Sequence, residues 1–112
     1  MTLFEKIITR EIPAGIVYED EDVIAFRDID PKAPTHIVIA TKRPIPTLND
    51  LAETDEELMG KMILAAKKIA ASENIGSDGY RIVFNCNKNG GQSVYHIHCH
   101  LLGGRAMSWP PG

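Results

Sequence analysis

The sequence predicts an α+β fold, in which two helices pack on a five-stranded antiparallel sheet. Three observations support this fold class. Five short stretches are rich in β-branched and aromatic residues and end at glycine, proline or acidic turns. Two further stretches carry apolar residues at helical spacing. The connections are mostly short, as in hairpins, which join antiparallel strands. We expect one domain over residues 1–112, with a C-terminal tail at about 107–112.

The N-terminal part is expected to form a short helix followed by a hairpin. The helix covers residues 2–11, where Thr2 can cap the first turn while Glu5 reaches back to the start. Strands follow at 15–18 and 23–26, and four consecutive acidic residues between them reverse the chain. This hairpin therefore has a solvated tip.

The middle of the chain supplies a third strand and the long helix. A loop that contains two prolines leads into the strand at 36–40. The helix is expected from about Asp55 to Glu73, with Thr54 and Glu57 as a second capping pair. Its methionines are interpreted as core residues.

Two more strands close the predicted sheet. The fourth covers residues 80–84 and the fifth the stretch 92–102. The turn between them, at 85–91, is short and contains glycine, so we expect these two strands to pair.

Composition excludes several classes of protein. The net charge of −3 argues against a partner such as nucleic acid or a membrane surface, which usually requires a basic protein. No apolar run approaches the ~20 residues of a membrane span. Cys86 and Cys99 form no spaced framework, which favours a reducing compartment. Residues 1–5 lack the features of a signal peptide. We therefore expect a cytoplasmic protein.

The most informative stretch holds three of the four histidines. His96, His98 and His100 occur at every second position. On a strand they line one face, because successive side chains point to opposite faces. On a helix they would fan out and form no row. Such a row is typical of a metal site, of a nucleophile with its helpers, or of a polar strand edge.

Metal binding and nucleophilic catalysis make different demands on this row. Zinc-binding imidazoles need acceptors behind them, and no carboxylate is near in sequence, although Asp28 or Asp30 can arrive through folding. A nucleophilic imidazole, with an ordinary pKa of ~6.5, needs an acceptor on its other nitrogen and donors for the phosphoryl oxygens. The segment 90–93, Gly-Gly-Gln-Ser, supplies such donors just before the row.

The histidine stretch resembles the His-x-His-x-His-x-x signature of the histidine triad superfamily, where x is hydrophobic. The rest of the chain is similar to the histidine triad nucleotide-binding (Hint) branch of that superfamily. Matching segments are found along nearly the whole chain: residues 3–8, 25–29, 33–36, 90–95, 103–105 and 109–112.

The resemblance implies an adenosine phosphoramidase-like hydrolase without cofactor or metal. Such an enzyme cleaves purine nucleoside phosphoramidates and related adenylates to the nucleoside monophosphate. Its partners are then purine nucleotides (AMP, GMP, adenosine phosphoramidates) and a second copy of the chain, in a homodimer with one continuous sheet. The strand from Tyr80 and the helix from Asp55 are expected near the two-fold axis, with Trp109 reaching the other subunit's site.

The resemblance also assigns roles to individual residues. His98 is expected to attack the α-phosphorus and form a covalent nucleotidyl-histidine. His100 contacts the phosphate and helps the leaving group depart, while His96 and His36 complete the relay that orients His98. The remaining expected contacts are the phosphate with Asn85, Gly91 and Ser93, the ribose with Asp28, and the base with Phe4, Ile7, Phe26 and Ile29.

Three other functions remain open at this point. The first is a transferase or dinucleotide hydrolase from another branch, against which the Trp-Pro-Pro-Gly tail argues. The second is a regulator that only senses nucleotides. The third is a zinc-binding interaction protein. Turnover of phosphoramidates and metal analysis distinguish these possibilities.

Overall fold

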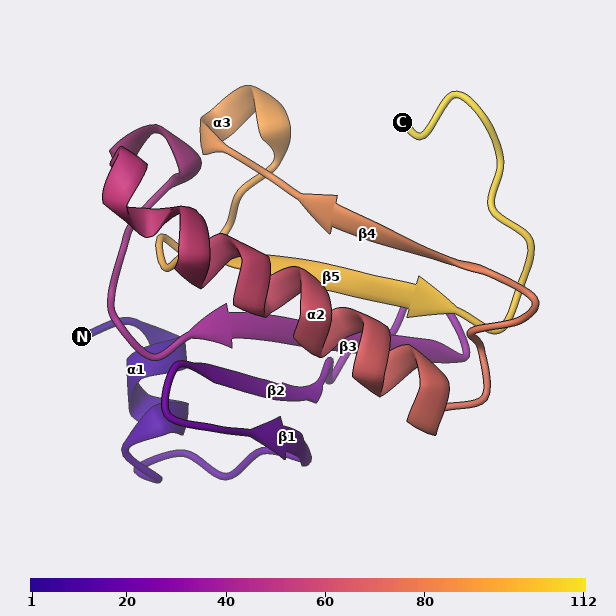
Figure 1. Ribbon diagram of the computed structural model, residues 1–112, viewed down its shortest axis with the longest axis horizontal. Coiled ribbons are helices and arrows are strands. Elements are labelled where there is room, and N and C mark those ends of the chain that lie inside the picture. The colour runs from indigo at the N-terminus through magenta and orange to yellow at the C-terminus, as the bar shows by residue number, and fades with distance from the viewer.

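The computed structural model describes all residues, 1–112, and contains one five-stranded sheet with three helices and two 3-10 turns (Figure 1). In chain order the elements are α1 (Leu3–Ile8), β1 (Ile16–Glu19), β2 (Val23–Arg27), β3 (Thr35–Thr41), η1 (Leu48–Asp50), η2 (Glu53–Asp55), α2 (Glu56–Ser72), β4 (Tyr80–Phe84), α3 (Asn87–Gly90) and β5 (His98–Gly103). All neighbouring strands are antiparallel and follow the order β1-β2-β3-β5-β4. The expected fold class is confirmed.

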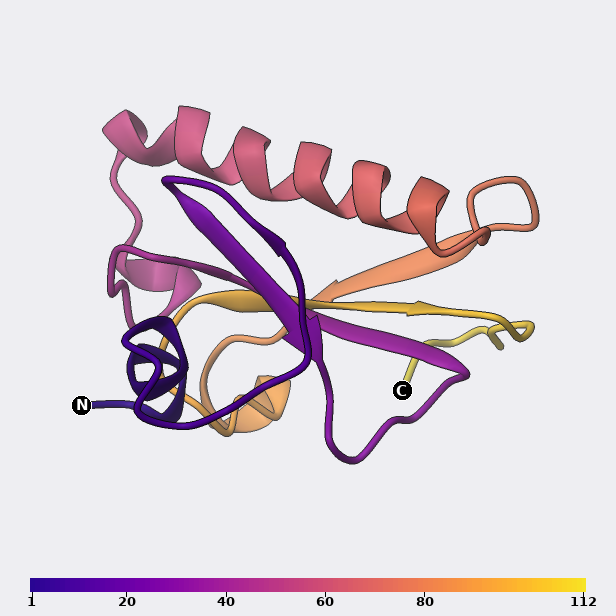
Figure 2. The ribbon, with the colours of Figure 1, turned by 90° about the horizontal axis from the view of Figure 1, so that it is seen from below.

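The two faces of the sheet have different coverings. Helix α2 lies across one face, and α1 and α3 lie on the opposite side (Figure 2). On β5, Cys99 and Leu101 belong to the core cluster under α2, together with Met62 of the helix. His98 and His100 therefore point to the other face, because side chains alternate along a strand. The sheet therefore separates His98 and His100 from the main core.

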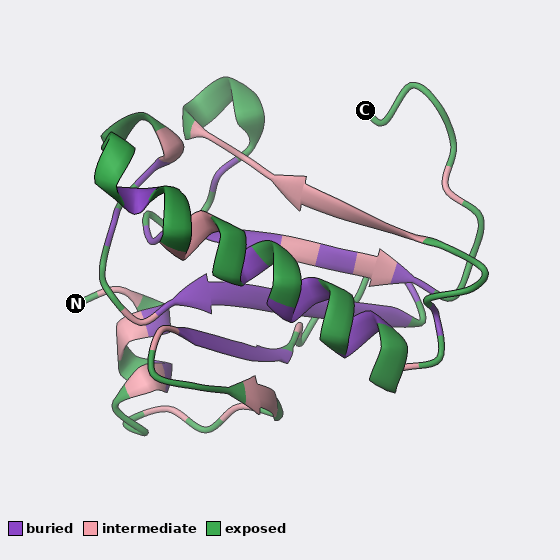
Figure 3. Cartoon of the chain, in the orientation of Figure 1, coloured by how far each residue is buried: buried purple, intermediate pink, exposed green.

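Burial decreases from the centre of the sheet to its edges (Figure 3). Every residue of the central strand β3 is buried, whereas no residue of the edge strands β1 and β4 is. A smaller core cluster fills the space between the sheet and α1. Its members are Phe4, Ile7, Ile24, Phe26, Val38 and Ala40. The interpretation of Met62 as a core residue is confirmed, and Met59 is partly buried and packs against the same cluster.

The predicted strands agree with the structure except for the fifth. Strand β4 has the expected bounds and pairs with β5 as expected. The prediction that the fifth strand covers 92–102 is wrong, because β5 begins only at His98. The main-chain N–H of Ile97 donates to Ile45 O, 2.6 Å away, in the connection after β3. The residues before His98 are thus connected to this segment and do not continue the strand.

The helix ends also differ in part from expectation. The capping pair of Thr2 and Glu5 is confirmed, but α1 ends at Ile8 rather than at residue 11. The second predicted pair is wrong, since the turn before α2 is closed by Asp55, whose carboxylate accepts from the N–H of Ala52 at 2.8 Å. The expected turn at 85–91 contains the short helix α3. No helix has the length and apolar character needed to cross a membrane.

Candidate active site

Strand register brings three of the four histidines together. Val38 of β3 lies opposite His100, and His36 is two residues from Val38 on the same face. The rings of His36 and His100 have centroids 5.0 Å apart, and those of His98 and His100 are 5.2 Å apart. The pairing of β3 with β5 thus brings His36 together with His98 and His100, although they are far apart in the sequence.

His98 has one ring nitrogen held by the main chain and the other one free. Nδ1 lies 2.6 Å from the carbonyl oxygen of His96. A carbonyl only accepts, so Nδ1 carries the proton and the neutral ring keeps its lone pair on Nε2. Nε2 has no protein partner, and the protein contains no fully buried side-chain nitrogen without one, so Nε2 is open to the cavity that His98 lines. This is the arrangement that a nucleophilic imidazole requires.

His36 and His100 form a second, separately organised pair. The main-chain N–H of Lys32 donates to His36 Nδ1 at 3.0 Å. The neutral His36 ring therefore carries its proton on Nε2, which donates to His100 Nδ1 at 2.8 Å. His100 in turn carries its proton on Nε2, as a donor toward the site. The sequence analysis missed the part played by Lys32, because a main-chain group leaves no signal in the residue type.

The expected relay that joins all four histidines is corrected by these contacts. His96 precedes β5 and is 1% exposed; its Nε2 donates to Thr41 O at 2.5 Å. It orients His98 with its main-chain carbonyl rather than with its ring. His36 hydrogen-bonds to His100, not to His98. The four histidines thus form two sets, one centred on His98 and one on His100.

Burial favours the neutral form of His36, His98 and His100. It lowers the pKa of His98 and, with the charge on neighbouring rings, lowers the pKa of His100 to about 4. Burial also lowers the pKa of His36, which the carboxylate of Asp28, 3.4 Å from Nε2, partly offsets. Neutral rings are the forms that the hydrogen bonds above require.

An apolar cavity of about 260 Å³ opens beside His98 and His100. Its walls come from α1, β2 and the segment before β5. Among the residues expected to bind substrate, it brings together Phe4, Ile7, Phe26, Asp28, Ile29 and Ser93. Phe4 packs edge-on against His98, with centroids 4.8 Å apart. Phe4, Ile7 and Phe26 are 5% exposed and also belong to the core, whereas Ile29 is 98% exposed at the rim.

A more polar cavity of about 400 Å³ lies on the other side of His100. It shares Asp28 and His100 with the apolar cavity and adds His36, Asn85 and Lys32. His100 therefore stands between an apolar compartment and a polar one. A substrate whose reacting atom sits at His98 and His100 can extend into both.

Unpaired main-chain donors lie next to the histidines. The N–H groups of Ser93 and Val94 have no acceptor within the protein, and both residues line the apolar cavity. Free N–H groups beside a cavity are suited to bind anionic oxygens. Gly91, which is expected at the phosphate, lines neither of the two cavities. The ring of Trp109, which is expected to reach the other subunit's site, packs over Arg81 of its own chain, 6.0 Å from the guanidinium carbon.

The model of the HIT domain family matches residues 9–107. The chain belongs to the HIT family. It is 58% identical to the purine nucleoside phosphoramidase of Escherichia coli K12 over 106 residues, which cover 95% of this chain and 89% of that protein. It is 54% identical to the 14 kDa zinc-binding protein of Zea mays, covering 99% and 88%. A HIT family hydrolase from Legionella pneumophila superposes with a TM-score of 0.98 at 54% identity, covering both chains fully.

This HIT domain also holds a group of potential metal ligands. Ligand atoms of Asp28, His36 and His100 all lie within 4.8 Å of one another. The carboxylate that the sequence analysis left to folding is therefore Asp28. His36 Nε2 and His100 Nδ1 already share a hydrogen bond of 2.8 Å, so a cation bound to these two nitrogens requires that bond to open.

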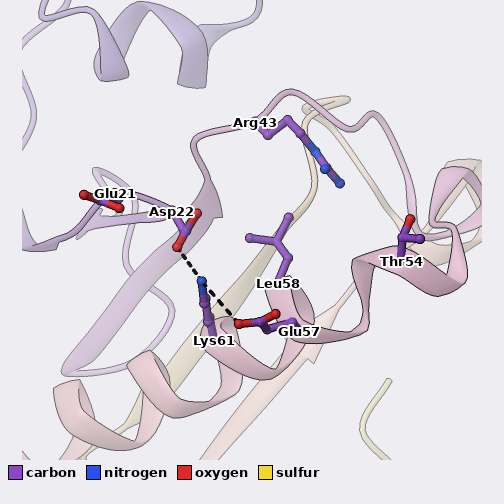
Figure 4. Close-up of a pocket in the computed structure, with 7 residues that line it drawn as sticks. All are labelled: Glu21, Asp22, Arg43, Thr54, Glu57, Leu58 and Lys61. Carbon is purple, nitrogen blue, oxygen red and sulfur yellow. Dashed lines mark hydrogen bonds and ion pairs between the residues drawn. The ribbon is translucent and has the colours of Figure 1, made fainter.

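A third cavity of the HIT domain, about 240 Å³, lies away from the histidines, between the β1–β2 turn and the start of α2 (Figure 4). Its lining is charged, and its charges are largely paired: Lys61 Nζ lies 2.8 Å from Asp22 Oδ2 and 3.8 Å from Glu57 Oε1. Arg43 pairs with Asp55. No histidine lines this cavity.

Proposed function

We propose that this HIT-family protein is a purine nucleoside phosphoramidase, which cleaves adenosine 5′-monophosphoramidates and related adenylates to the nucleoside monophosphate. The enzyme class, a hydrolase of phosphorus–nitrogen bonds, is supported by the 58% identity to a protein of that name. The observation that carries the proposal for this chain is His98, whose Nδ1 is held by a carbonyl and whose Nε2 is open to the cavity.

The reaction proceeds in two steps at phosphorus. His98 Nε2 forms a bond to the α-phosphorus as the bond to the amine breaks, which gives a nucleotidyl-histidine. The carbonyl of His96 accepts from Nδ1–H and so stabilises the positive charge that develops on the ring. His100 donates through Nε2 at the phosphate, and this proton passes to the departing nitrogen, which leaves as the amine. Water then attacks phosphorus, the bond to His98 Nε2 breaks, and the proton lost by water returns to His100 as the nucleoside monophosphate is released.

The apolar cavity holds the nucleoside. Phe4, Ile7 and Phe26 contact the base and Ile29 covers it at the rim, while Asp28 accepts from the ribose hydroxyls. Ser93 and Asn85 bind the phosphate, together with the unpaired N–H groups before β5. Gly91 lines neither of these two cavities, and Trp109 is assigned to the other subunit's site. AMP, GMP and their phosphoramidates are the expected ligands.

We infer that the active form is a homodimer in the cytoplasm. Strand β4 is at the edge of the sheet, where its outer hydrogen-bonding groups are available to another strand. Helix α2 also exposes Ile63 and Leu64, at 46% and 56%. A second copy that extends the sheet at β4 covers such surface. Both cysteines are free, which is consistent with a reducing compartment.

A turnover panel tests this function. Phosphoramidates of adenosine, guanosine, cytidine and uridine with one common amine are incubated with the purified protein. Release of AMP and GMP is expected at rates within about tenfold of each other, because an apolar pocket without committed donors discriminates weakly. Pyrimidine substrates are expected to react more slowly. Binding of AMP without turnover of any substrate contradicts the proposal and favours a nucleotide-sensing regulator.

A further inference from the structure

The amide of Gln92 connects three segments around the site. Its Oε1 accepts from the N–H of Asn87 at 2.9 Å, and its Nε2 donates to Pro46 O at 2.8 Å and to Val94 O at 3.1 Å. The main chain adds a fourth bond, from the Gln92 N–H to Asn87 O at 3.1 Å. The side chain is buried, and all its hydrogen-bonding groups are used.

These bonds hold a loop whose backbone is left-handed at two positions. Gly91, with φ 80°, adopts this conformation freely because glycine has no Cβ, whereas Asn87, with φ 60°, adopts a conformation that is uncommon for a residue with a side chain. Such conformations persist only where the surroundings determine them. Gln92 bonds to both main-chain groups of Asn87 and so holds this residue in its left-handed conformation.

The same amide controls the residues that face the phosphate. The bond from Gln92 Nε2 to Val94 O closes a ring around Ser93, whose N–H and hydroxyl have no partner in the protein. The bond to Pro46 ties this ring to the connection after β3. Ser93 is thereby held at the cavity wall by a neighbour that does not itself line either cavity.

We propose that Gln92 is a positioning residue for phosphate recognition: it acts through Ser93 and Val94 and contacts no substrate atom. This proposal rests on the proposed function, because it assumes that a 5′-phosphate occupies the site. It requires that loss of the amide weaken contacts to the phosphate and leave contacts to the nucleoside intact. Replacing a residue that only stabilises the fold weakens the contacts to the phosphate and to the nucleoside by similar factors.

The test compares AMP with adenosine, which differ by the phosphate alone. Dissociation constants for both are measured by titration calorimetry with the wild type, Gln92→Met and Asn89→Leu. Both variants replace an amide by an apolar side chain of similar shape in the same loop, but Asn89 is exposed and makes no side-chain hydrogen bond. Gln92→Met should weaken AMP binding about tenfold and adenosine binding less than about twofold. Asn89→Leu should change neither.

Kinetics and a milder variant complete the experiment. Gln92→Asn keeps the amide but is one methylene too short to reach all its partners, so it should shift the AMP-to-adenosine ratio in the same direction by a smaller factor. In turnover, kcat should fall about ten- to a hundredfold in Gln92→Met and in Gln92→Asn, because the phosphate is misaligned at His98.

Several results overturn the proposal. These are equal losses for AMP and adenosine, no loss for either, the same shift in Asn89→Leu, or failure of both Gln92 variants to fold. Failure of the proposed function is a separate outcome. It is recognised when the wild type binds AMP but turns over no phosphoramidate, whatever the variants do.

Discussion

Nε2 of His36 lies 2.8 Å from Nδ1 of His100, so a hydrogen bond joins side chains from two neighbouring strands. The N–H of Lys32 occupies the other nitrogen of His36. Because that N–H can only donate, it determines the position of every proton in the pair. His100 consequently presents an N–H, and not a lone pair, to the cavity that it lines.

Replacing His36 should disturb catalysis through His100. In His36→Phe, His100 Nδ1 loses its donor and the proton can move away from Nε2. We expect kcat to fall about ten- to a hundredfold with little change in AMP affinity. In His36→Gln an amide N–H can still reach His100, so part of the rate should return. Steady-state kinetics of both variants measure this, and equal rates in Phe and Gln variants contradict the assigned tautomer.

The pH dependence of kcat/KM should report the neutral form of His98. Protonation of Nε2 removes the lone pair, so the rate is lost as pH falls. Burial lowers the pKa of His98 below its ordinary 6.5, so the midpoint of the decline should lie below that value. The pKa of His100 is about 4, so a second proton should steepen the decline only there. A rate that rises on acidification, or a midpoint above 6.5, contradicts this assignment.

Metal removal should leave hydrolysis unchanged. The hydrogen bonds of His98 and His100 account for nucleophile and donor without a metal. Added zinc should inhibit, because its available ligands, Asp28, His36 and His100, include a residue that contacts the substrate. Rates are measured after treatment with EDTA and again with excess zinc. A rate that collapses with the chelator and returns with zinc contradicts the prediction.

Dimer formation should depend on the exposed apolar residues of α2. Leu64→Glu places a charge on the exposed apolar face of α2 and should shift the protein toward a monomer at micromolar concentration. Ile16→Glu makes the same kind of change on β1, at the opposite edge of the sheet, and serves as the control. Sedimentation velocity distinguishes the two. A wild-type monomer, or dissociation caused by the control, contradicts the inferred interface.

Local patterns in the sequence predict much of this fold. The capping pair of Thr2 and Glu5, the bounds of β4 and the core position of Met62 all depend on neighbours in sequence or on simple periodicity. The His-x-His spacing likewise predicts that His98 and His100 share a face. These features need no knowledge of distant parts of the chain.

The start of β5 and the role of His96 depend on distant main-chain groups. His96 bonds to Thr41 O, and Ile97 bonds to Ile45 O. Every residue carries a main-chain carbonyl group. The residue types at positions 41 and 45 therefore do not predict these bonds. Alternation alone therefore predicts a strand through His96, while the structure removes His96 from the strand and uses its carbonyl to orient His98.

The central claim, that His98 is the nucleophile, is tested most directly by trapping the covalent intermediate. Wild-type protein is quenched in acid-free denaturant during turnover of an adenosine phosphoramidate, digested, and analysed by mass spectrometry. We predict one adenylyl group on His98, its absence in a folded His98→Ala variant, and a loss of turnover in that variant on the order of 10⁴-fold. An undiminished rate in His98→Ala, or an adduct mapped to His96, His100 or His36, contradicts the account.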